Sequence, residues 1–347
     1  YVHYPDGTRL GEKEGDEPQF DPGVITENGK TYLYTGFCGG GDKSRHGAMC
    51  TVLDSDMLTV LEAPVFVAPS CATSAGTGFE GHEFFEAPSI RKKDGMYYFI
   101  YSSIKGHELC YATSKEPTKD FAYQGVVVSG GDLHIDTYKP AEKCGYYTAN
   151  NHGSMVQIGD DWFIFYHRHT NGTNYSRQGC FEKLSFAEDG SIIQATMTSC
   201  CSLAPLRGEG EYPTYIACNL FTEVEATYVP WSGWMDDRFP KITQTGGDGD
   251  KNLGYIANMR NTATAGFKYF DCQGIRRISI RTKGYAKGCM EVRTAWDGPV
   301  LGTIPLAFAN VWHDTAADIA IPDGVNALYF TFNGFGHLQF AAFNLIK

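Results

Sequence analysis

One motif recurs in this chain at an interval of 65 to 66 residues, and this repeat limits the folds that the sequence can adopt. Its three copies begin at Asp21 (DPGVITENGKTYLYT), Glu86 (EAPSIRKKDGMYYFIYS) and His152 (HGSMVQIGDDWFIFYH). Each copy opens on a polar residue, continues as a short apolar strand, turns at a glycine and ends in an aromatic strand. This pattern predicts three β-hairpins. Their turns are expected at residues 27–30, 93–95 and 159–161.

Further strand-like stretches lie between the three hairpins. GAMCTVLDS, ELCYATS and GCFEKLSF each end near an acidic turn, which gives about four strands per repeat. Four strands in a repeat of this length are typical of a β-propeller blade, whose innermost strand begins at the central axis. The polar residues that open the three copies should therefore converge on one funnel. The alternative is a β-sandwich in which the periodicity is accidental.

The composition favours an all-β protein of two domains. The 347 residues exceed the usual size of one core, and 42% hydrophobic residues are enough to bury two. Forty Gly, 15 Pro, 22 Phe and 21 Tyr favour short strands and tight turns over helices. With a formal net charge of −11, the chain has no basic stripe for nucleic acid or an anionic membrane. No stretch reaches the roughly 18 apolar residues that span a bilayer, so neither partner is expected.

The 11 cysteines favour a reducing compartment. They are odd in number and irregularly spaced, they include the adjacent Cys200 and Cys201, and they form no pair of zinc-binding CxxC motifs. A disulfide framework usually shows even, spaced pairs. We therefore expect mostly buried free thiols and a cytoplasmic location. A secreted protein with some disulfide bridges is the alternative.

The three motifs together resemble glycoside hydrolase family 43, five-bladed propellers that act on arabinose- and xylose-containing glycans. The resemblance covers roughly residues 1–213. It rests on Asp-Pro before a YLYTG strand, FFEAPSI before a YYFIYS strand, and NNHGS before FIFYHR. It implies an inverting glycosidase with three carboxylates: a base, a second Asp that orients and tunes the acid, and a Glu acid.

Carried over motif by motif, this resemblance assigns roles to individual residues. Glu86 would be the general acid and Asp21 the tuning carboxylate. His152 would be the axial histidine, beside a central metal ion or water, and Arg177 in NYSRQGC would reach the sugar from the last blade. Phe85, directly before Glu86, is a further candidate for contact with the substrate.

The same residues fit the chemistry without the resemblance. A glycosidic oxygen leaves poorly unless it is protonated, and a neighbouring carboxylate and aromatic surroundings help an acid to keep its proton. Glu86 follows two phenylalanines, Asp21 supplies the negative neighbour, and Arg177 can offset the charge and bind sugar hydroxyls. Alternatively, Asp21 and Glu86 are turn residues and His152 is a core histidine. Their common phase in the repeat argues against this alternative.

The base of the family, an Asp in the first blade, has no counterpart in this chain. An inverting site needs a second carboxylate about 6.5–9.5 Å from the acid, with a water between them. Asp6, Asp132 and Asp136 lie outside the repeat phase and are interpreted as loop residues. We expect two further blades, roughly 130 residues, before Tyr1 as a separate segment or chain, and no activity without them.

The blade pattern stops after residue 213. Residues 214–220 are expected to form a linker, and alternating short strands fill residues 221–347. This stretch is similar to carbohydrate-binding module family 6, a β-sandwich, in the pieces VEATY, LGYIANM, MEVRTAW, VWHDTAADIAI and ALYFTFNGFGHLQFAAFNL. The chain is therefore predicted to be all-β, a partial five-bladed β-propeller followed by a β-sandwich (jelly-roll) domain.

The similarity to this module family suggests where the second domain would bind ligands. Tyr255 and Trp312 match positions for sugar stacking, because aromatic rings cover the apolar faces of sugars. Paired glutamates that hold a structural calcium would correspond to Glu223 and Glu225, whereas His152 is the metal candidate of the first domain. No cofactor is expected for the chemistry. The other candidate sugar contacts are Trp231, Trp234 and Trp296.

The leading hypothesis is an inverting exo-glycosidase that releases pentose units from hemicellulose or pectin side chains. It would be of the α-L-arabinofuranosidase or β-xylosidase type, with an oligo- or polysaccharide as substrate; a galactose-type sugar also stays open. The alternatives are a non-catalytic glycan-binding protein, a propeller scaffold for protein partners, and a sandwich domain that only stabilises the propeller. The charged groups on the predicted axis favour catalysis, because propeller packing does not require them.

Overall fold

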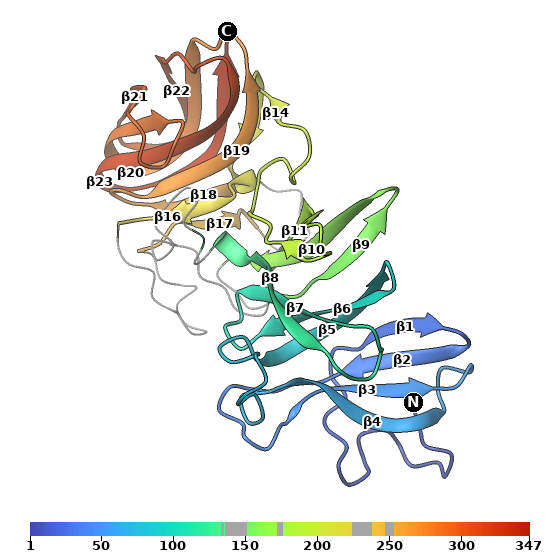
Figure 1. Cartoon of the computed structure of the whole chain (residues 1–347). Coiled ribbons are helices and arrows are strands. Elements are labelled where there is room, and N and C mark those ends of the chain that lie inside the picture. The colour runs from blue at the N-terminus through green and yellow to red at the C-terminus, as the bar shows by residue number, and fades with distance from the viewer. Residues whose placement is uncertain (133–134, 136–150, 172–175, 224–237, 247–252) are drawn as a thin grey trace. The chain divides into compact units, whose positions relative to one another are not determined.

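The computed structural model shows an almost entirely β-stranded chain (Figure 1). It describes residues 1–132, 135, 151–171, 176–223, 238–246 and 253–347. Within these residues the helical elements are two single 3₁₀ turns, η1 (Gly130–Asp132) and η2 (Thr214–Ile216). None of the described helical segments has the length and apolar character needed to cross a membrane.

The chain forms two compact units. The first comprises Tyr1–Ser129, Ala149–His167 and Lys183–Ala195. The second comprises Gly130–Thr148, Arg168–Glu182 and Thr196–Lys347. Both units draw on segments that are separated in the sequence.

The first sheet is antiparallel, with the order β1-β2-β3-β4. Its strands are β1 (Gly23–Glu27), β2 (Lys30–Thr35), β3 (Gly47–Leu53) and β4 (Val60–Pro69). The turn between β1 and β2 is Asn28-Gly29, with φ of 53° and 77°. Positive φ at both positions is what a two-residue type I′ hairpin requires, so the predicted turn at 27–30 is present.

The second sheet repeats this arrangement, with the order β5-β6-β7-β8. Its strands are β5 (Phe84–Lys93), β6 (Met96–Ser103), β7 (Glu108–Ser114) and β8 (Ala122–Ser129). The turn Asp94-Gly95 again has positive φ at both residues, 50° and 80°. The rings of Phe84, Phe99 and Tyr101 are buried and pack against one another beneath this sheet.

A third hairpin follows. It joins β9 (Ser154–Ile158) and β10 (Asp161–His169), and β11 (Arg177–Lys183) adds the third strand. A small pair, β12 (Ser185–Phe186) and β13 (Ile192–Ile193), comes next. β5 contacts β1, β2 and β3 of the first sheet and also β9, so the first strands of the three hairpins are neighbours. The three hairpins predicted from the repeat are therefore present, with their first strands next to one another.

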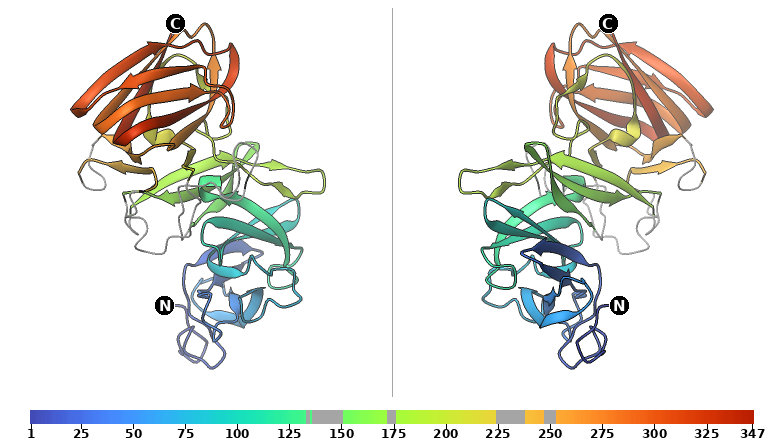
Figure 2. Two further views of the ribbon diagram at one scale, coloured as in Figure 1. Left: turned by 90° about the vertical axis from the view of Figure 1, so that its left-hand side faces the viewer. Right: turned by 90° about the vertical axis from the view of Figure 1, so that its right-hand side faces the viewer.

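The second unit contains a ten-stranded antiparallel and parallel sheet system that forms a β-sandwich (Figure 2). Its principal path is β14-β19-β23-β18-β17, and β20 also pairs with β21, β22 and β23. The strands are β14 (Leu206–Arg207), β15 (Gly210–Pro213), β16 (Asn219–Phe221), β17 (Lys241–Gln244), β18 (Gly254–Met259), β19 (Thr264–Cys272), β20 (Arg277–Arg293), β21 (Gly302–Leu306), β22 (Ala309–Asp318) and β23 (Gly324–Ile346).

The sandwich sheet begins earlier in the sequence than the predicted boundary. β14 pairs with β19 and β15 pairs with β23, although residues 206–213 were expected in the last blade. β16 pairs with β19, so part of the expected linker, residues 214–220, also lies in the sheet. These short strands satisfy their backbone hydrogen bonds on the edges of longer sandwich strands.

Two long strands hold the sandwich together. β20 pairs with β23 along the whole length of β20, from Arg277 opposite Ile346 to Arg293 opposite Tyr329. Their inward side chains enclose one core that includes the fully buried Phe267, Phe330 and Phe340. Gly336 lies opposite Ala286 in this pairing, and a Cβ there would come within 1.9 Å of the Tyr285 carbonyl oxygen. Glycine is therefore required at this position.

The ten cysteines that the structure describes are all free thiols. Six of them are buried: Cys38, Cys50, Cys110, Cys200, Cys218 and Cys272. The expected predominance of buried free thiols therefore holds for the described part of the chain.

Candidate active site

Asp21, Glu86 and His152 meet in the first unit. The Nε2 atom of His152 lies 3.1 Å from Oδ2 of Asp21 and 3.4 Å from Oε1 of Glu86. One ligand atom from each of the three residues lies within 4.8 Å of the other two. Asp21 lies two residues before β1, Glu86 is the third residue of β5, and His152 lies two residues before β9. The three therefore come from the same end of neighbouring strands, as their common phase predicted.

Local distortion of the backbone accompanies both carboxylates. The pairing of β5 with β6 changes register on each side of Glu86, which faces Ser102. Ala87 has a φ of 60° and Asp21 a φ of 50°, both in the left-handed region that these residues rarely adopt. A bulge of this kind re-aims a strand residue away from the regular alternation. Strained backbone at both positions is typical of functional sites.

The histidine carries the positive charge of the cluster. Burial by itself lowers the pKa of His152, but hydrogen bonds and charge attraction from Asp21 and Glu86 outweigh it and raise the pKa to about 9. At neutral pH the ring is therefore an imidazolium. Because Glu86 is buried and Asp21 is half-buried, this cation offsets negative charge where water cannot.

The spacing of the two carboxylates limits what they can do together. The ligand oxygens of Asp21 and Glu86 are within 4.8 Å of each other. An inverting acid and base stand about 6.5–9.5 Å apart, because a water must fit between the base and the sugar. Asp21 is thus too close to Glu86 to be the base of an inverting pair.

Three phenylalanines form a strip, and two of them, Phe20 and Phe85, directly precede Asp21 and Glu86 in the sequence. The ring of Phe37 is 5.2 Å from that of Phe20 and 5.4 Å from that of Phe85. Phe20 is 46% exposed and Phe37 is 39% exposed, which is unusual for rings in mutual contact. Phe85 was a candidate; Phe20 and Phe37 were not. Phe20 could have been found, because it precedes Asp21 as Phe85 precedes Glu86.

Arg177 and two of the three spare aspartates are among the described residues. Arg177, exposed at the start of β11, belongs to the second unit, where burial and its positive charge lower the pKa of His169 to about 4. Asp6 is an exposed turn residue paired with Lys13, as expected of a loop carboxylate. Asp132 is fully buried in η1, so it is not a surface loop residue. Asp136 falls outside the described residues.

The cluster does not fit a calcium ion held directly by all three residues. Calcium takes six to eight oxygen ligands, whereas this set offers two carboxylates and an imidazole nitrogen. Glu223, the other calcium candidate, is exposed, and Glu225 lies outside the described part of the chain. No step of the chemistry is therefore routed through a metal.

The predicted aromatic pair of the second unit is in direct contact. The rings of Tyr255 and Trp312 have centroids 5.4 Å apart at an angle of 65°. The Lys283 ammonium lies 4.9 Å from the centre of the Trp312 ring. This edge-to-face contact leaves no room for a sugar ring between the two side chains. Trp231 and Trp234 fall outside the described residues.

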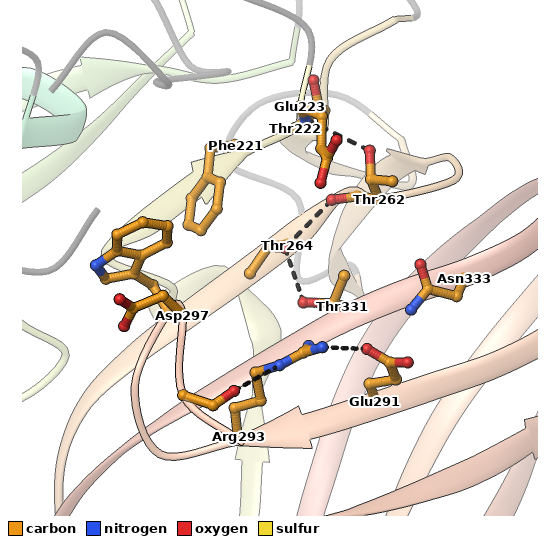
Figure 3. A pocket seen from close by; sticks show the side chains of 12 residues that line it. Phe221, Thr222, Glu223, Thr262, Thr264, Glu291, Arg293, Asp297, Thr331 and Asn333 are labelled. Carbon is orange, nitrogen blue, oxygen red and sulfur yellow. Dashed lines mark hydrogen bonds and ion pairs between the residues drawn. The ribbon is translucent and has the colours of Figure 1, made fainter. Parts of the chain in front are cut away.

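A separate pocket of about 310 Å³ opens on the sandwich (Figure 3). Its wall contains a hydroxyl pair, Thr264 and Thr331, whose oxygens are 2.8 Å apart. Arg293 pairs with Glu291 and donates through Nε to the Gly298 carbonyl oxygen at 3.1 Å. The remaining lining residues are Phe221, Thr222, Glu223, Thr262, Trp296, Asp297 and Asn333. Among the candidates for sugar contact that the structure describes, Trp296 is the one that lines this pocket.

Comparison with known proteins bears on the first unit. The model of the family described as "Glycosyl hydrolases family 43" matches residues 4–192. The chain belongs to glycosyl hydrolase family 43. The match includes both carboxylates and the histidine of the cluster, so this family 43 chain carries them within the family's own domain.

One relative and two solved structures extend the comparison. A protein named "Xylosidase/arabinosidase" from Thermoclostridium stercorarium is 64% identical over 99% of this chain and 73% of its own length. A family 43 arabinoxylan arabinofuranohydrolase from Bacillus subtilis is 20% identical, with a TM-score of 0.44 over 99% of this chain and 71% of that one. CsCBM6-3 from Clostridium stercorarium is 17% identical, with a TM-score of 0.33 over 42% of this chain and 98% of that one.

Proposed function

We propose that this family 43 chain supplies the acid half of an inverting glycosidase that removes terminal arabinofuranosyl or xylosyl units from xylan-type glycans. The observation that carries the proposal is the contact of Glu86 and Asp21 with one imidazolium, His152. The name of the 64% identical relative, a xylosidase/arabinosidase, supports the sugar class. Hydrolysis by a carboxylic acid and a carboxylate base needs no cofactor.

Each group has a defined part in the proposed reaction. Glu86 donates a proton to the glycosidic oxygen as the bond to the sugar breaks, which turns a poor leaving group into an alcohol. Asp21 supplies negative charge next to the acid. His152 fixes both carboxyl groups in place. The water that attacks the opposite face of the sugar is activated by a base outside residues 1–347.

The first sheet supports the proposal that further blades complete the site. β4 exposes Leu61, Val65 and Phe66, although apolar side chains of a propeller blade normally pack on the next blade. The chain spans 73% of the length of its 64% identical relative, so that relative contains additional sequence that this chain does not match. We propose that blades supplied as a separate segment or chain cover this surface and bring the base.

Aryl α-L-arabinofuranosides and aryl β-xylosides test the proposal directly. The chain alone should be inactive, and the chain joined to upstream blades should release the phenol. In that assembled protein, Glu86→Gln should lower kcat by roughly 10²–10⁴, the usual contribution of a positioned acid. Asp6→Asn, a change at an exposed carboxylate paired with Lys13, is the control. Full activity of the chain alone, or of Glu86→Gln, would refute the proposal.

A carbohydrate-binding role of the sandwich is the second proposal, and the pocket of Figure 3 favours it. An indole, paired hydroxyls and an Arg–Glu pair are groups that stack on sugars and hydrogen-bond to them. Calorimetric titration with xylotetraose should show binding that Trp296→Ala abolishes and Trp312→Ala preserves. If Trp312→Ala abolished binding and Trp296→Ala preserved it, the sugar site would instead lie at Tyr255 and Trp312. No binding by the wild-type chain would leave the sandwich a stabilising domain.

A further inference from the structure

A second cluster of metal-ligating side chains lies in the first unit and belongs to no step of the proposed reaction. His82 precedes β5, Glu108 begins β7, and Cys110 follows two residues later in β7. Their ligand atoms all lie within 4.8 Å of one another. Glu108 and Cys110 are buried, whereas His82 is partly exposed. The cluster is thus built into the sheet and accessible from one side.

The three donor atoms have nearly the spacing of a tetrahedral site. Cys110 Sγ is 3.5 Å from Glu108 Oε1 and 3.7 Å from His82 Nδ1. With zinc–ligand bonds of about 2.0–2.3 Å, tetrahedral geometry places a sulfur about 3.6 Å from an oxygen or nitrogen ligand. The remaining distance, His82 Nδ1 to Glu108 Oε1, is 2.6 Å and would have to open to about 3.4 Å. One carboxyl rotation is therefore the main adjustment.

We propose that His82, Glu108 and Cys110 form a binding site for a divalent cation of the zinc class. Imidazole, carboxylate and thiolate are the three ligand types that zinc accepts, and a thiolate disfavours calcium and magnesium. Three protein ligands leave the fourth position to water, on the side where His82 is exposed. This site shares no residue with the cluster of Asp21, Glu86 and His152, so an ion can bind here without contacting those carboxylates.

Binding releases protons and displaces one neighbour. The Cys110 thiol loses its proton to solvent, and His82 binds the ion through Nδ1 with its remaining ring proton on Nε2. Lys105 Nζ now lies 3.5 Å from that Nε2 and 4.0 Å from Glu108 Oε1, so its charge has to move away. Because Lys105 is partly exposed and flexible, this movement needs no change in the fold. In the structure, Ser103 donates to Oε1 of Glu108 at 2.6 Å, and this bond helps to position the carboxyl group.

A bound ion would link two separate parts of the second sheet. His82 lies four residues before Glu86, and its carbonyl oxygen accepts the Tyr101 hydroxyl at 2.7 Å. An ion that joins His82 to two residues of β7 would tie the segment before β5 to the far side of the same sheet. Such an ion stabilises the folded first unit, because it binds the native state and not the unfolded chain.

Cobalt(II) and zinc(II), used as the metals alone, test the site on the full chain. Cobalt should give a thiolate-to-cobalt charge-transfer band, and zinc should bleach it with a stoichiometry of one. Cys110→Ser should abolish the band, and His82→Ala should weaken zinc binding by about 100-fold or more, since even outer-shell changes cost 10–100-fold. Lys105→Ala should tighten binding. Melting without metal shows that the variants fold.

Matched controls separate this site from other cation-binding groups. His152→Asn should keep the band, because the carboxylate cluster contains no thiol. His46→Ala should also keep it: His46 pairs with Glu17 at 2.7 Å, much as His82 pairs with Glu108, but has no sulfur close enough to complete a cluster among the described residues. Absence of a thiolate band in the wild-type chain, or its persistence in Cys110→Ser, overturns the proposal.

Discussion

His152 and Asp21 form an ion pair, Nε2 to Oδ2 at 3.1 Å, between the residues that open the third and first copies of the sequence repeat. Glu86, which opens the second copy, contacts the same nitrogen. One imidazolium therefore joins three hairpins that are far apart in the sequence. The charge state of that ring controls the electrostatics of the whole candidate site.

The first prediction concerns the titration of His152. Its pKa of about 9 lies above the ordinary 6.5, so the ion pairs stabilise the fold fully below about pH 6.5 and are lost as pH rises through 9. Asp21→Asn should lower the midpoint measured by NMR titration of the ring protons, and it should reduce stability most at or below pH 6.5. Asp6→Asn should leave the midpoint unchanged. A wild-type midpoint near 6.5 would contradict the assignment.

The second prediction concerns the exposed phenylalanine strip. In the assembled enzyme, Phe37→Ala should raise KM roughly three- to tenfold with a smaller effect on kcat, because an aromatic contact is worth about 0.5–1.5 kcal/mol. Phe37 is partly exposed, so the melting temperature should change little. Phe335→Ala removes an exposed ring of the second unit and serves as the control. Equal KM values for both variants would show that the strip does not contact substrate.

Much of the first unit follows from its sequence. The Gly-containing turns and aromatic strands of the repeat predicted three hairpins, and Asn28-Gly29 and Asp94-Gly95 adopt the turn geometry that such pairs favour. The residue at which the sandwich sheet starts could not be predicted from the sequence. β14 and β15 have only two and four residues, too few to show a periodicity in the sequence. They are strands because they form backbone pairs with β19 and β23.

The candidate site was predictable to the same degree. The phase of the repeat brought Asp21, Glu86 and His152 together, because equivalent positions of neighbouring hairpins share one end of the sheets. Phe37 lies beyond the end of β2, outside that phase, and only the fold places it between two other rings. His82 and Glu108 are 26 residues apart without a shared motif, so their contact was invisible in the sequence.

The third prediction concerns Glu182, a buried carboxyl of the second unit. Burial raises its pKa to about 7 despite hydrogen bonds from Ser202 and Thr198. The folded pKa exceeds the unfolded value of 4.5, so stability falls as pH rises from about 4.5 to 7, by on the order of 3 kcal/mol. Glu182→Gln should remove this loss. Urea unfolding of both proteins at pH 5 and pH 8 measures it, and an unchanged difference would argue against a protonated Glu182.

The fourth prediction concerns the sandwich core. Phe330 is fully buried and Phe335, five residues later in the same strand, is 68% exposed. Phe330→Ala should lower the free energy of unfolding by about 3–5 kcal/mol through lost burial and a new cavity. Phe335→Ala should change it by about 0.5 kcal/mol or less. Reversed effects in chemical unfolding would mean that the side chains of β23 face the other way, and equal effects would contradict the difference in burial.

The fifth prediction compares two glycines, one where a side chain would cause only backbone strain and one where it would also cause a steric clash. Gly274 (φ 67°) and Gly336 (φ 84°) are both left-handed, but a Cβ would meet nothing at Gly274 and the Tyr285 carbonyl oxygen at Gly336. Gly274→Ala should cost about 1–2 kcal/mol from strain alone. Gly336→Ala should cost more, measured by the same unfolding titration. Equal losses of unfolding free energy would show that β20 and β23 can move apart at Gly336.

β23 pairs with β15, β18, β19 and β20, so four strands depend on the last 23-residue strand of the fold. The order of synthesis then matters: as the ribosome makes the chain, the earlier sandwich strands emerge before the strand that completes their hydrogen bonding. Until residues 324–346 are available, those edges are open to pairing with other chains. Expression that slows or stops within this segment should therefore yield aggregated protein, whereas the hairpins of the first unit already have their partners.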